Sequence, residues 1–323
     1  MLSRVANCIY WMSRYIERAE NVARFVDTNL QMILDLPEGT LQQWQPLVNV
    51  TGDGKYFNEY YGPADERNVI RFLTFDKHYA NSILSCLCYA RDNARTVREY
   101  ITLEMWEQIN KFYLMVNSDE ALAMAHDSSH EFFSKVMMAS HLFEGITNAT
   151  MSHNEGWHFS QLGRMIERAD KTSRILDVKY FILLPDVHYV GMTFDYIQWS
   201  ALLRSTSGFE MYRKRHGKLL REKIVEFLLL DQEFPRSVHF CVREAERSLL
   251  SITNTPPGTY TNDAERRMGL LRSEFDYANA GDIIGSGLHE FIDDFQVKLN
   301  GIDDAVFDTF FALRPISSLK PAF

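Results

Sequence analysis

The sequence feature that most constrains the fold is a charged helical segment that occurs twice. Residues 15–27 and 165–177 both contain the run Ile-Glu-Arg-Ala, and further charged residues follow it in the same order. The two copies stand 150 positions apart (167 minus 17). The matched charged residues, first copy before second, are Arg14 and Arg164, Glu17 and Glu167, Arg18 and Arg168, Arg24 and Arg174, and Asp27 and Asp177. We therefore predict two related halves, of about residues 1–150 and 151–323.

Both copies are predicted to be helices, because neither contains Gly or Pro and apolar residues recur at spacings of three and four. Further matches continue in chain order. Ser82 aligns with Ser237 at an offset of 155, and His130 aligns with His289 at an offset of 159. We find no alternating strand pattern of useful length. The sequence thus predicts an all-α fold, an extended helical bundle of two tandem repeats related by a pseudo-two-fold axis. With no Gly/Ser linker between the halves, we expect residues 1–323 to form a single domain.

The charges of the repeated helix fall into two groups on a helical wheel drawn at about 100° per residue. One group is a stripe, for which a solvent-exposed face with i,i+4 pairs is the ordinary interpretation; in the first copy it comprises Glu17, Glu20, Arg24 and Asp27. Arg18 and its match Arg168 form the other group, since they lie inside the apolar arc. A buried guanidinium needs a carboxylate or carbonyl partner. Two interpretations stay open. One is a pair of core salt bridges that fix helix register, and the other is an interior polar pocket lined by Glu17, Arg18, Glu167 and Arg168.

A third Glu-Arg pair is Glu246-Arg247, whose aligned positions read Arg91-Asp92. Opposite charges at both places make these two segments candidate sources of partners for Arg18 and Arg168. The acid pairs near the end of the chain, Asp303-Asp304 among them, are expected to face solvent.

Familiar catalytic motifs are missing from the sequence. It contains no G-x-S-x-G, no phosphate-binding glycine loop and no dinucleotide fingerprint. Glu155-x-x-His158 is the only spacing of its kind, so the ligand pattern of a di-metal carboxylate bundle is incomplete. We expect no metal and no cofactor, and the sequence names no catalytic residue.

Composition limits the classes of partner. The net charge of −9 argues against nucleic acid, because no basic stripe is available for phosphates. The longest apolar runs are too short to cross a bilayer. Four cysteines without zinc spacing are expected to be reduced thiols, as in a cytoplasmic protein.

The repeated Ile-Glu-Arg-Ala motif, with Arg14 and Arg164 before it, resembles that of the bacterial alpha-E family. The segments Trp199–Ser205 and Pro235–Val238 also resemble segments of that family, so the resemblance covers the whole chain. The family has no established biochemical function. Its members typically sit beside, or are fused to, a circularly permuted ATP-grasp protein and a transglutaminase-like protein, which implies a system that makes, modifies or tags peptides.

These observations favour a non-catalytic, all-helical partner of an ATP-grasp ligase, which holds the enzyme or its peptide substrate. The alternative is an enzyme of the same pathway that uses Glu17 or Glu167 as acid/base and Arg18 or Arg168 to clamp a carboxylate or phosphate. A homo-oligomeric scaffold, with the charged stripe at its surface, is a second alternative.

Overall fold

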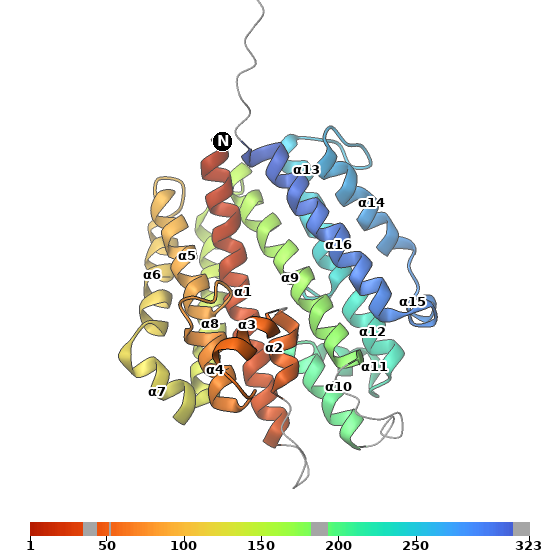
Figure 1. The fold of residues 1–323 in the computed structure, drawn as a ribbon. Coiled ribbons are helices and arrows are strands. Elements are labelled where there is room, and N and C mark those ends of the chain that lie inside the picture. The colour runs from red at the N-terminus through yellow and green to blue at the C-terminus, as the bar shows by residue number, and fades with distance from the viewer. Residues whose placement is uncertain (35–43, 52, 182–192, 313–323) are drawn as a thin grey trace, which may run out of the picture.

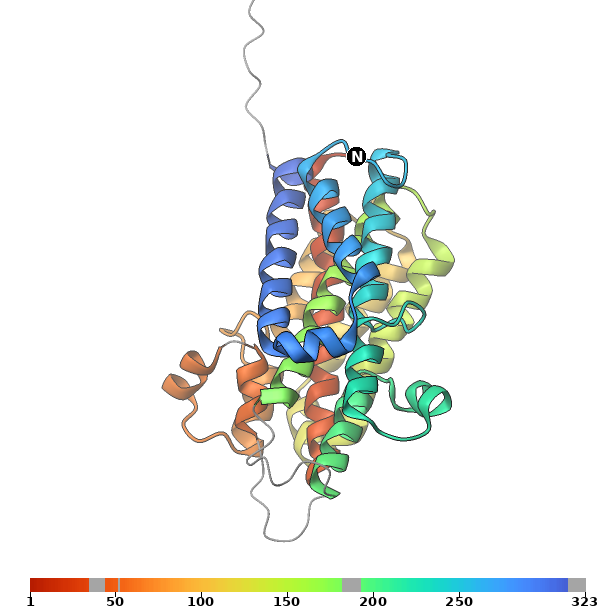
Figure 2. The ribbon, with the colours of Figure 1, turned by 90° about the vertical axis from the view of Figure 1, so that its right-hand side faces the viewer.

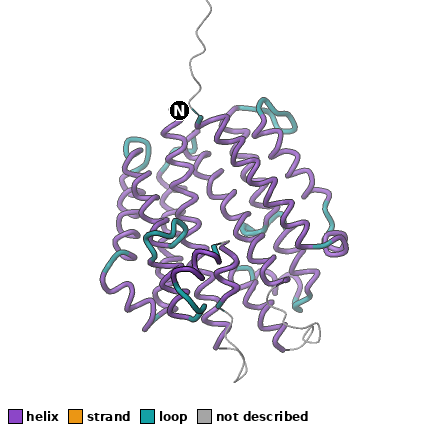
Figure 3. The backbone as a smooth tube through the Cα atoms, viewed as in Figure 1, coloured by secondary structure: helices purple, strands orange, loops and turns teal. Residues whose placement is uncertain are grey.

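The computed structural model describes residues 1–34, 44–51, 53–181 and 193–312 (Figure 1). Its regular structure within these ranges is helical throughout, without a strand (Figure 3), which confirms the predicted all-α class. The helices are α1 (Ser3–Leu34), α2 (Gln45–Thr51), α3 (Gly54–Tyr60), α4 (Glu66–Phe75), α5 (Ile83–Thr96), α6 (Leu103–Val116), α7 (Asp119–Asp127), α8 (Ser129–Thr150), α9 (Glu155–Phe181), α10 (Thr193–Ser205), α11 (Phe209–His216), α12 (Arg221–Leu229), α13 (Val238–Thr253), α14 (Asp263–Tyr277), α15 (Ala280–Ser286), α16 (Leu288–Val306) and the π-helical turn η2 (Phe307–Phe311).

The two copies of the repeated segment lie on the longest helices, α1 and α9. Helix α1 runs without interruption because it contains neither Gly nor Pro. Pro37 and Pro185, the residues expected to end the two helices, lie outside the described residues. Two matched serines begin matched helices, since Ser82 accepts a hydrogen bond from the backbone N–H of Ser85, and Ser237 does the same for Phe240.

The long helices form two groups of four around a shared centre. Helices α1, α5, α6 and α8 pack in a ring, and α9, α13, α14 and α16 pack in a second ring. Helices α1 and α9 pack against each other and so join the two rings, as seen at the middle of Figure 1. In Figure 2, α13, α14 and α16 (light to dark blue) lie side by side, with their axes roughly parallel to the axis of α1 (red). The shorter helices α2–α4 and α10–α12 gather at the end of the molecule opposite the N-terminus (Figure 1).

Small residues let α1 and α9 approach closely. A Cβ added to Gly163 of α9 would stand 2.5 Å from the backbone oxygen of Tyr10 in α1. One turn away, the hydroxyls of Ser13 and Ser160 are 2.8 Å apart and share a hydrogen bond. This tight crossing is what brings the charged segments of the two helices within reach of one another.

Candidate functional site

The two Glu-Arg motifs pair with each other across the α1–α9 contact. Arg18 of α1 donates from Nε and Nη2 to the two carboxylate oxygens of Glu167, at 2.6 and 2.9 Å. Arg168 of α9 donates in the same way to Glu17, at 2.9 and 2.7 Å. Both contacts are bidentate, the geometry that gives the strongest guanidinium–carboxylate hydrogen bonds. We call these four residues the central ion pairs.

Three of the four residues of the central ion pairs are buried, and Arg18 is partly exposed. Glu17, Glu167 and Arg168 are 2%, 0% and 4% exposed, and the Arg18 side chain is 14% exposed. The predicted need of Arg18 and Arg168 for carboxylate partners is thus met. The prediction of a solvent-exposed stripe is wrong, because Glu20 is 0% exposed and both Arg24 and Asp27 are also buried. Helix α1 has neighbours on several sides, so its charged face contacts other helices instead of water.

Each central carboxylate belongs to a larger charge cluster. The Glu167 cluster contains three carboxylates and four cations, joined by ion pairs in the described residues: Glu167, Asp170 and Asp303 with Arg14, Arg18, Lys171 and Arg174. The Glu17 cluster has the same balance: Glu17, Glu20 and Glu144 with Arg24, Arg164, Arg168 and Arg236. Asp303 was expected to face water, but it accepts hydrogen bonds from Tyr10 at 2.5 Å and from Arg14 at 2.6 Å.

The members of the two clusters follow the sequence offsets. Asp303 and Glu144 are 159 positions apart, and each receives an arginine, Arg14 or Arg164, from the helix of the other half. The outermost acids also match, because Asp27 contacts His130 at 2.7 Å and Asp177 contacts His289 at 2.8 Å. Such matched contacts are what a duplication leads one to expect, while the duplication itself stays a prediction.

Electrostatics keep the central acids ionised. Burial alone would raise the pKa of Glu167, but the charges of Arg18, Lys171 and Arg14 outweigh burial and hold that pKa well below its ordinary value. The pKa of Glu17 is also lowered, because Arg168 and Arg236 outweigh the effects of burial and of nearby Glu20. Neither acid therefore has the near-neutral pKa that suits proton transfer.

Two cations of the Glu17 cluster are poorly compensated. Burial and the neighbouring Arg236 lower the pKa of Arg24, and burial and Arg168 lower that of Arg164. The Nε atoms of Arg24 and Arg164 are buried with no hydrogen-bond acceptor among the described residues. This pattern is consistent with one more cation than carboxylate in the cluster.

Glu246 and Arg247 are not partners of the central ion pairs. Glu246 contacts Arg272 at 3.0 Å, and Arg247, whose side chain is 77% exposed, lies 3.8 Å from Glu244. At the aligned positions, Arg91 donates to Asn110 and Asp92 contacts Arg95. The expectation that these segments supply partners is wrong, since α1 and α9 supply them to each other.

Sequence reasoning missed several members of the clusters. Asn81 accepts from Arg18 at 2.7 Å, and Arg236 reaches Glu17 at 3.2 Å. A signal for both existed, because each directly precedes a matched helix-capping serine, Ser82 or Ser237. For Glu144 and Asp303 the offset of 159 was the available signal.

Pockets of different size adjoin the clusters. Beside Glu17 the space is only about 10 Å³, whereas a pocket of about 210 Å³ lies against the Glu167 cluster. Another pocket, of about 330 Å³, is lined by Arg24, Asp27 and Arg204 among others.

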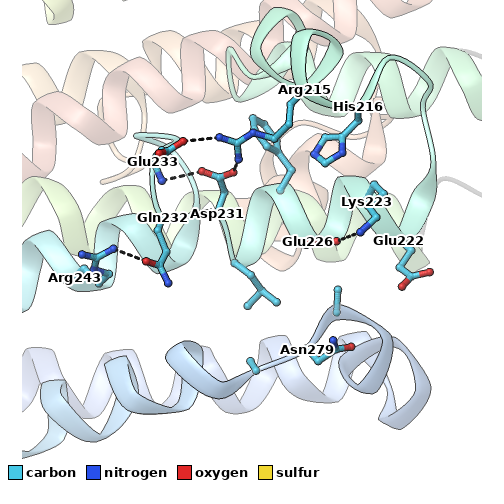
Figure 4. A pocket seen from close by; sticks show the side chains of 14 residues that line it. Arg215, His216, Glu222, Lys223, Glu226, Asp231, Gln232, Glu233, Arg243 and Asn279 are labelled. Atoms are coloured by element: carbon cyan, nitrogen blue, oxygen red, sulfur yellow. Dashed lines mark hydrogen bonds and ion pairs between the residues drawn. The ribbon is translucent and has the colours of Figure 1, made fainter.

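A larger pocket of about 710 Å³ lies among α11, α12, α13 and α15 (Figure 4). Its charged side chains pair mostly with one another. Arg215 contacts Asp231 and Glu233, and Lys223 contacts Glu226 at 2.6 Å. Arg215 belongs to the basic end of α11.

The described part of the chain offers no group of three or more His, Cys, Asp or Glu side chains that could hold a metal ion. Within the same ranges, no helix combines the length and the apolar character that crossing a membrane requires.

The Glu-Arg motif is also the feature by which a known protein family is described. A family model for a predicted alpha-helical domain with a conserved ER motif matches residues 1–311. The chain belongs to the Alpha-E family. In this member, the Glu and Arg of each motif form the central ion pairs with the motif of the other helix.

Similar proteins include uncharacterised proteins of Mycobacterium bovis and Mycobacterium tuberculosis. Each is 22% identical over 336 aligned residues, which cover 96% of this chain and 37% of the relative. The chain thus spans little more than a third of the length of these relatives. No solved structure matches the chain significantly.

Proposed function

We propose that this Alpha-E chain is a non-catalytic helical partner of an ATP-grasp ligase, in a cytoplasmic system that makes or modifies peptides and includes a transglutaminase-like protein. The burial and the hydrogen bonding of Glu17 and Glu167 support the proposal that the chain is not a catalyst. Each is at least 98% buried and bound by both arms of an arginine. A general acid or base must reach its substrate and exchange a proton near the operating pH. Side chains held in this way fix how α1 packs against α9.

The mycobacterial relatives support a partnership with further polypeptide. In them, the region similar to this chain makes up only 37% of the protein. In the relatives this region is covalently joined to other segments. We infer that in this protein the corresponding segments are separate chains, which the helical chain binds. The identity of the partners as ATP-grasp and transglutaminase-like proteins rests on the family resemblance of the Glu-Arg motifs.

The direct experiment is to mix the purified chain with the ATP-grasp protein of the same organism. We expect a stable complex by size-exclusion chromatography with light scattering, and a change in the rate or product length of the ligase. The ligase is held at about 10 μM and this chain is added in 10-fold excess. If no complex forms, the Kd lies above about 100 μM, which corresponds to a binding free energy weaker than about −5.5 kcal/mol. That result, together with an unchanged activity of the ligase, would contradict the proposal.

An enzyme of the same pathway is the second candidate, and the pocket beside Arg18 is the observation that favours it. The variant Glu167→Gln separates the two. If the chain is a scaffold, the folded Glu167→Gln variant should still bind the ligase and change its rate or product length as wild type does. If the chain is an enzyme that uses Glu167 as acid/base, the variant should lose about 100-fold or more of the activity.

A further inference from the structure

The pocket of the Glu167 cluster is built mainly from cationic side chains. Its volume is about 210 Å³, and its charged lining consists of Arg14, Arg18, Lys171, Arg174, Asp170 and Asp303. A water molecule takes up about 30 Å³ of liquid, so the pocket has room for a group several times larger. The side chains of Arg174 and Asp303 are 28% and 29% exposed, and the pocket therefore opens to solvent at their end.

Hydrogen-bond donors remain available in this pocket. Arg174 contacts Asp170 through Nε, at 2.9 and 3.0 Å, and its two terminal nitrogens have no acceptor among the described residues. Lys171 donates to the same carboxylate at 2.9 Å and lies 3.5 Å from the Glu167 carboxylate, so at least one of its three N–H bonds remains for a ligand. Both side chains are partly exposed, at 28% and 17%, so a ligand can reach them.

The Glu17 cluster shows why this space is open. At the position 155 residues after Asn81 stands Arg236, whose guanidinium contacts Glu17, Glu20 and Asn21. The shorter Asn81 accepts from Arg18 of the Glu167 cluster, and its other hydrogen bond runs outward to Asp53 at 3.4 Å. The cation comes instead from α9, where Lys171 stands 150 residues after Asn21. The charge balance is thus the same in both clusters. The side chain of Arg236 fills the Glu17 cluster, whereas the corresponding space in the Glu167 cluster stays open.

Charge decides what the open pocket can accept. Four cations already face three carboxylates in the Glu167 cluster, so a further cation entering the pocket would add to an existing positive excess. An anion would neutralise the excess. A planar guanidinium and a nearby ammonium match a group with two or three oxygens, such as a carboxylate or a phosphate.

We propose that the pocket between α1, α9 and α16 binds one compact oxyanion, the carboxylate or phosphate group of a larger ligand, through Arg174 and Lys171. Arg14 and Arg18 line the inner wall and remain bound to Glu167. This binding does not depend on a partnership with a ligase, and it requires no reaction.

The test is isothermal titration calorimetry on the full chain at constant ionic strength. The probes are inorganic phosphate, a short peptide with a free C-terminal carboxylate, and the same peptide with an amidated C-terminus. We expect binding of phosphate or of the free-acid peptide, and at least 10-fold weaker binding to Arg174→Gln. Lys171→Met/Arg174→Gln should bind neither. The matched control is Arg95→Gln, which removes an exposed arginine paired with Asp92 on α5 and should bind like wild type.

The probes also identify the source of the oxyanion. A preference of at least 10-fold for the free acid over the amide identifies a peptide carboxylate, while binding of phosphate alone identifies a phosphate group. Failure of wild type to bind phosphate or free-acid peptide at millimolar concentration would overturn the proposal. Equal binding by wild type and a folded Arg174→Gln variant would also overturn it, and circular dichroism melting shows whether each variant is folded.

Discussion

At the scale of single residues, the central ion pairs set helix register more than they add net stability. Burying two charges costs several kcal/mol per ion, and the mutual attraction of a bidentate pair offsets roughly that amount. Losing one partner is different, because the charge left behind stays buried. The two Glu-Arg motifs therefore make the α1–α9 register specific, since a shift by one residue would separate both pairs.

Removing one guanidinium should destabilise the protein strongly. We expect Arg18→Met to lower the free energy of unfolding by about 3 kcal/mol, because it leaves buried Glu167 with fewer partners. Arg18→Ala should cost more, since it also removes the packing of the aliphatic stem. Arg95→Met, at an exposed ion pair, should cost less than about 1 kcal/mol. Urea denaturation measures all three, and equal stability of both Arg18 variants, close to wild type, would remove the argument for a buried pair.

Acid should unfold the protein through the cluster carboxylates. The pKa values of Glu17, Glu20, Glu167 and Asp170 are lowered in the folded state, so the unfolded state binds more protons as pH falls. The resulting stability is present above the unfolded Glu pKa of 4.5 and is lost as pH falls below it. We expect urea midpoints to stay level from pH 7 to about 5 and then to drop. Level midpoints down to pH 3 would contradict this assignment.

The sequence could predict part of this site. Arg18 and Arg168 stand within apolar arcs, and that misfit correctly predicts buried carboxylate partners. It could not predict that the partner is the motif of the other helix, because a helical wheel describes one helix against an unspecified neighbour. The charged stripe was assigned to solvent for the same reason, although α8 and α10 also cover α1.

At the scale of elements, the contact between α1 and α9 depends on a small residue at the crossing. Helix bounds were largely predictable, since Ser3–Leu34 has no helix breaker and Ser82 and Ser237 are good capping residues. The crossing of α1 and α9 could not be predicted, because it depends on how closely the backbones of residues about 150 positions apart approach each other.

Gly163→Ala should disturb this crossing. The added Cβ would lie 2.5 Å from the backbone oxygen of Tyr10, so one helix must shift. We expect a loss of about 1–3 kcal/mol, typical of overpacking, and a lower melting temperature. The control is Gly145→Ala on α8, where the new Cβ would meet no atom within 4 Å apart from its chain neighbours and the backbone of its own helix. That change should be neutral or stabilising by up to about 1 kcal/mol, from helix propensity. Similar melting temperatures for the two variants would argue against a tight crossing.

At the scale of the whole molecule, two rings of four helices share one interface that contains both charge and apolar side chains. One large hydrophobic cluster extends through both halves, and residues such as Ile16 and Ile166 belong to it. Neither half completes its own charge clusters. The prediction that residues 1–323 form a single domain, made because no Gly/Ser linker separates the halves, agrees with this mutual dependence and stays a prediction.

Residues 1–150 and 151–323 expressed separately should be poorly soluble, because each would expose the apolar and charged face of α1 or α9. Co-expression of the two fragments should restore a soluble 1:1 complex. Size-exclusion chromatography and thermal melting of each fragment measure this. Two monomeric fragments that melt cooperatively on their own would show instead that the halves are independent domains.

The crossed pairing also has a consequence for the newly made chain. Arg18 leaves the ribosome 149 residues before Glu167, and Glu17 leaves it 151 residues before Arg168. At about 5–20 residues per second, translation separates each partner from the other by about 7–30 s. During that interval the charges of α1 have no partner from α9 and must stay hydrated. The N-terminal ring of helices can therefore close around α1 only provisionally, and its final packing awaits synthesis of the second motif.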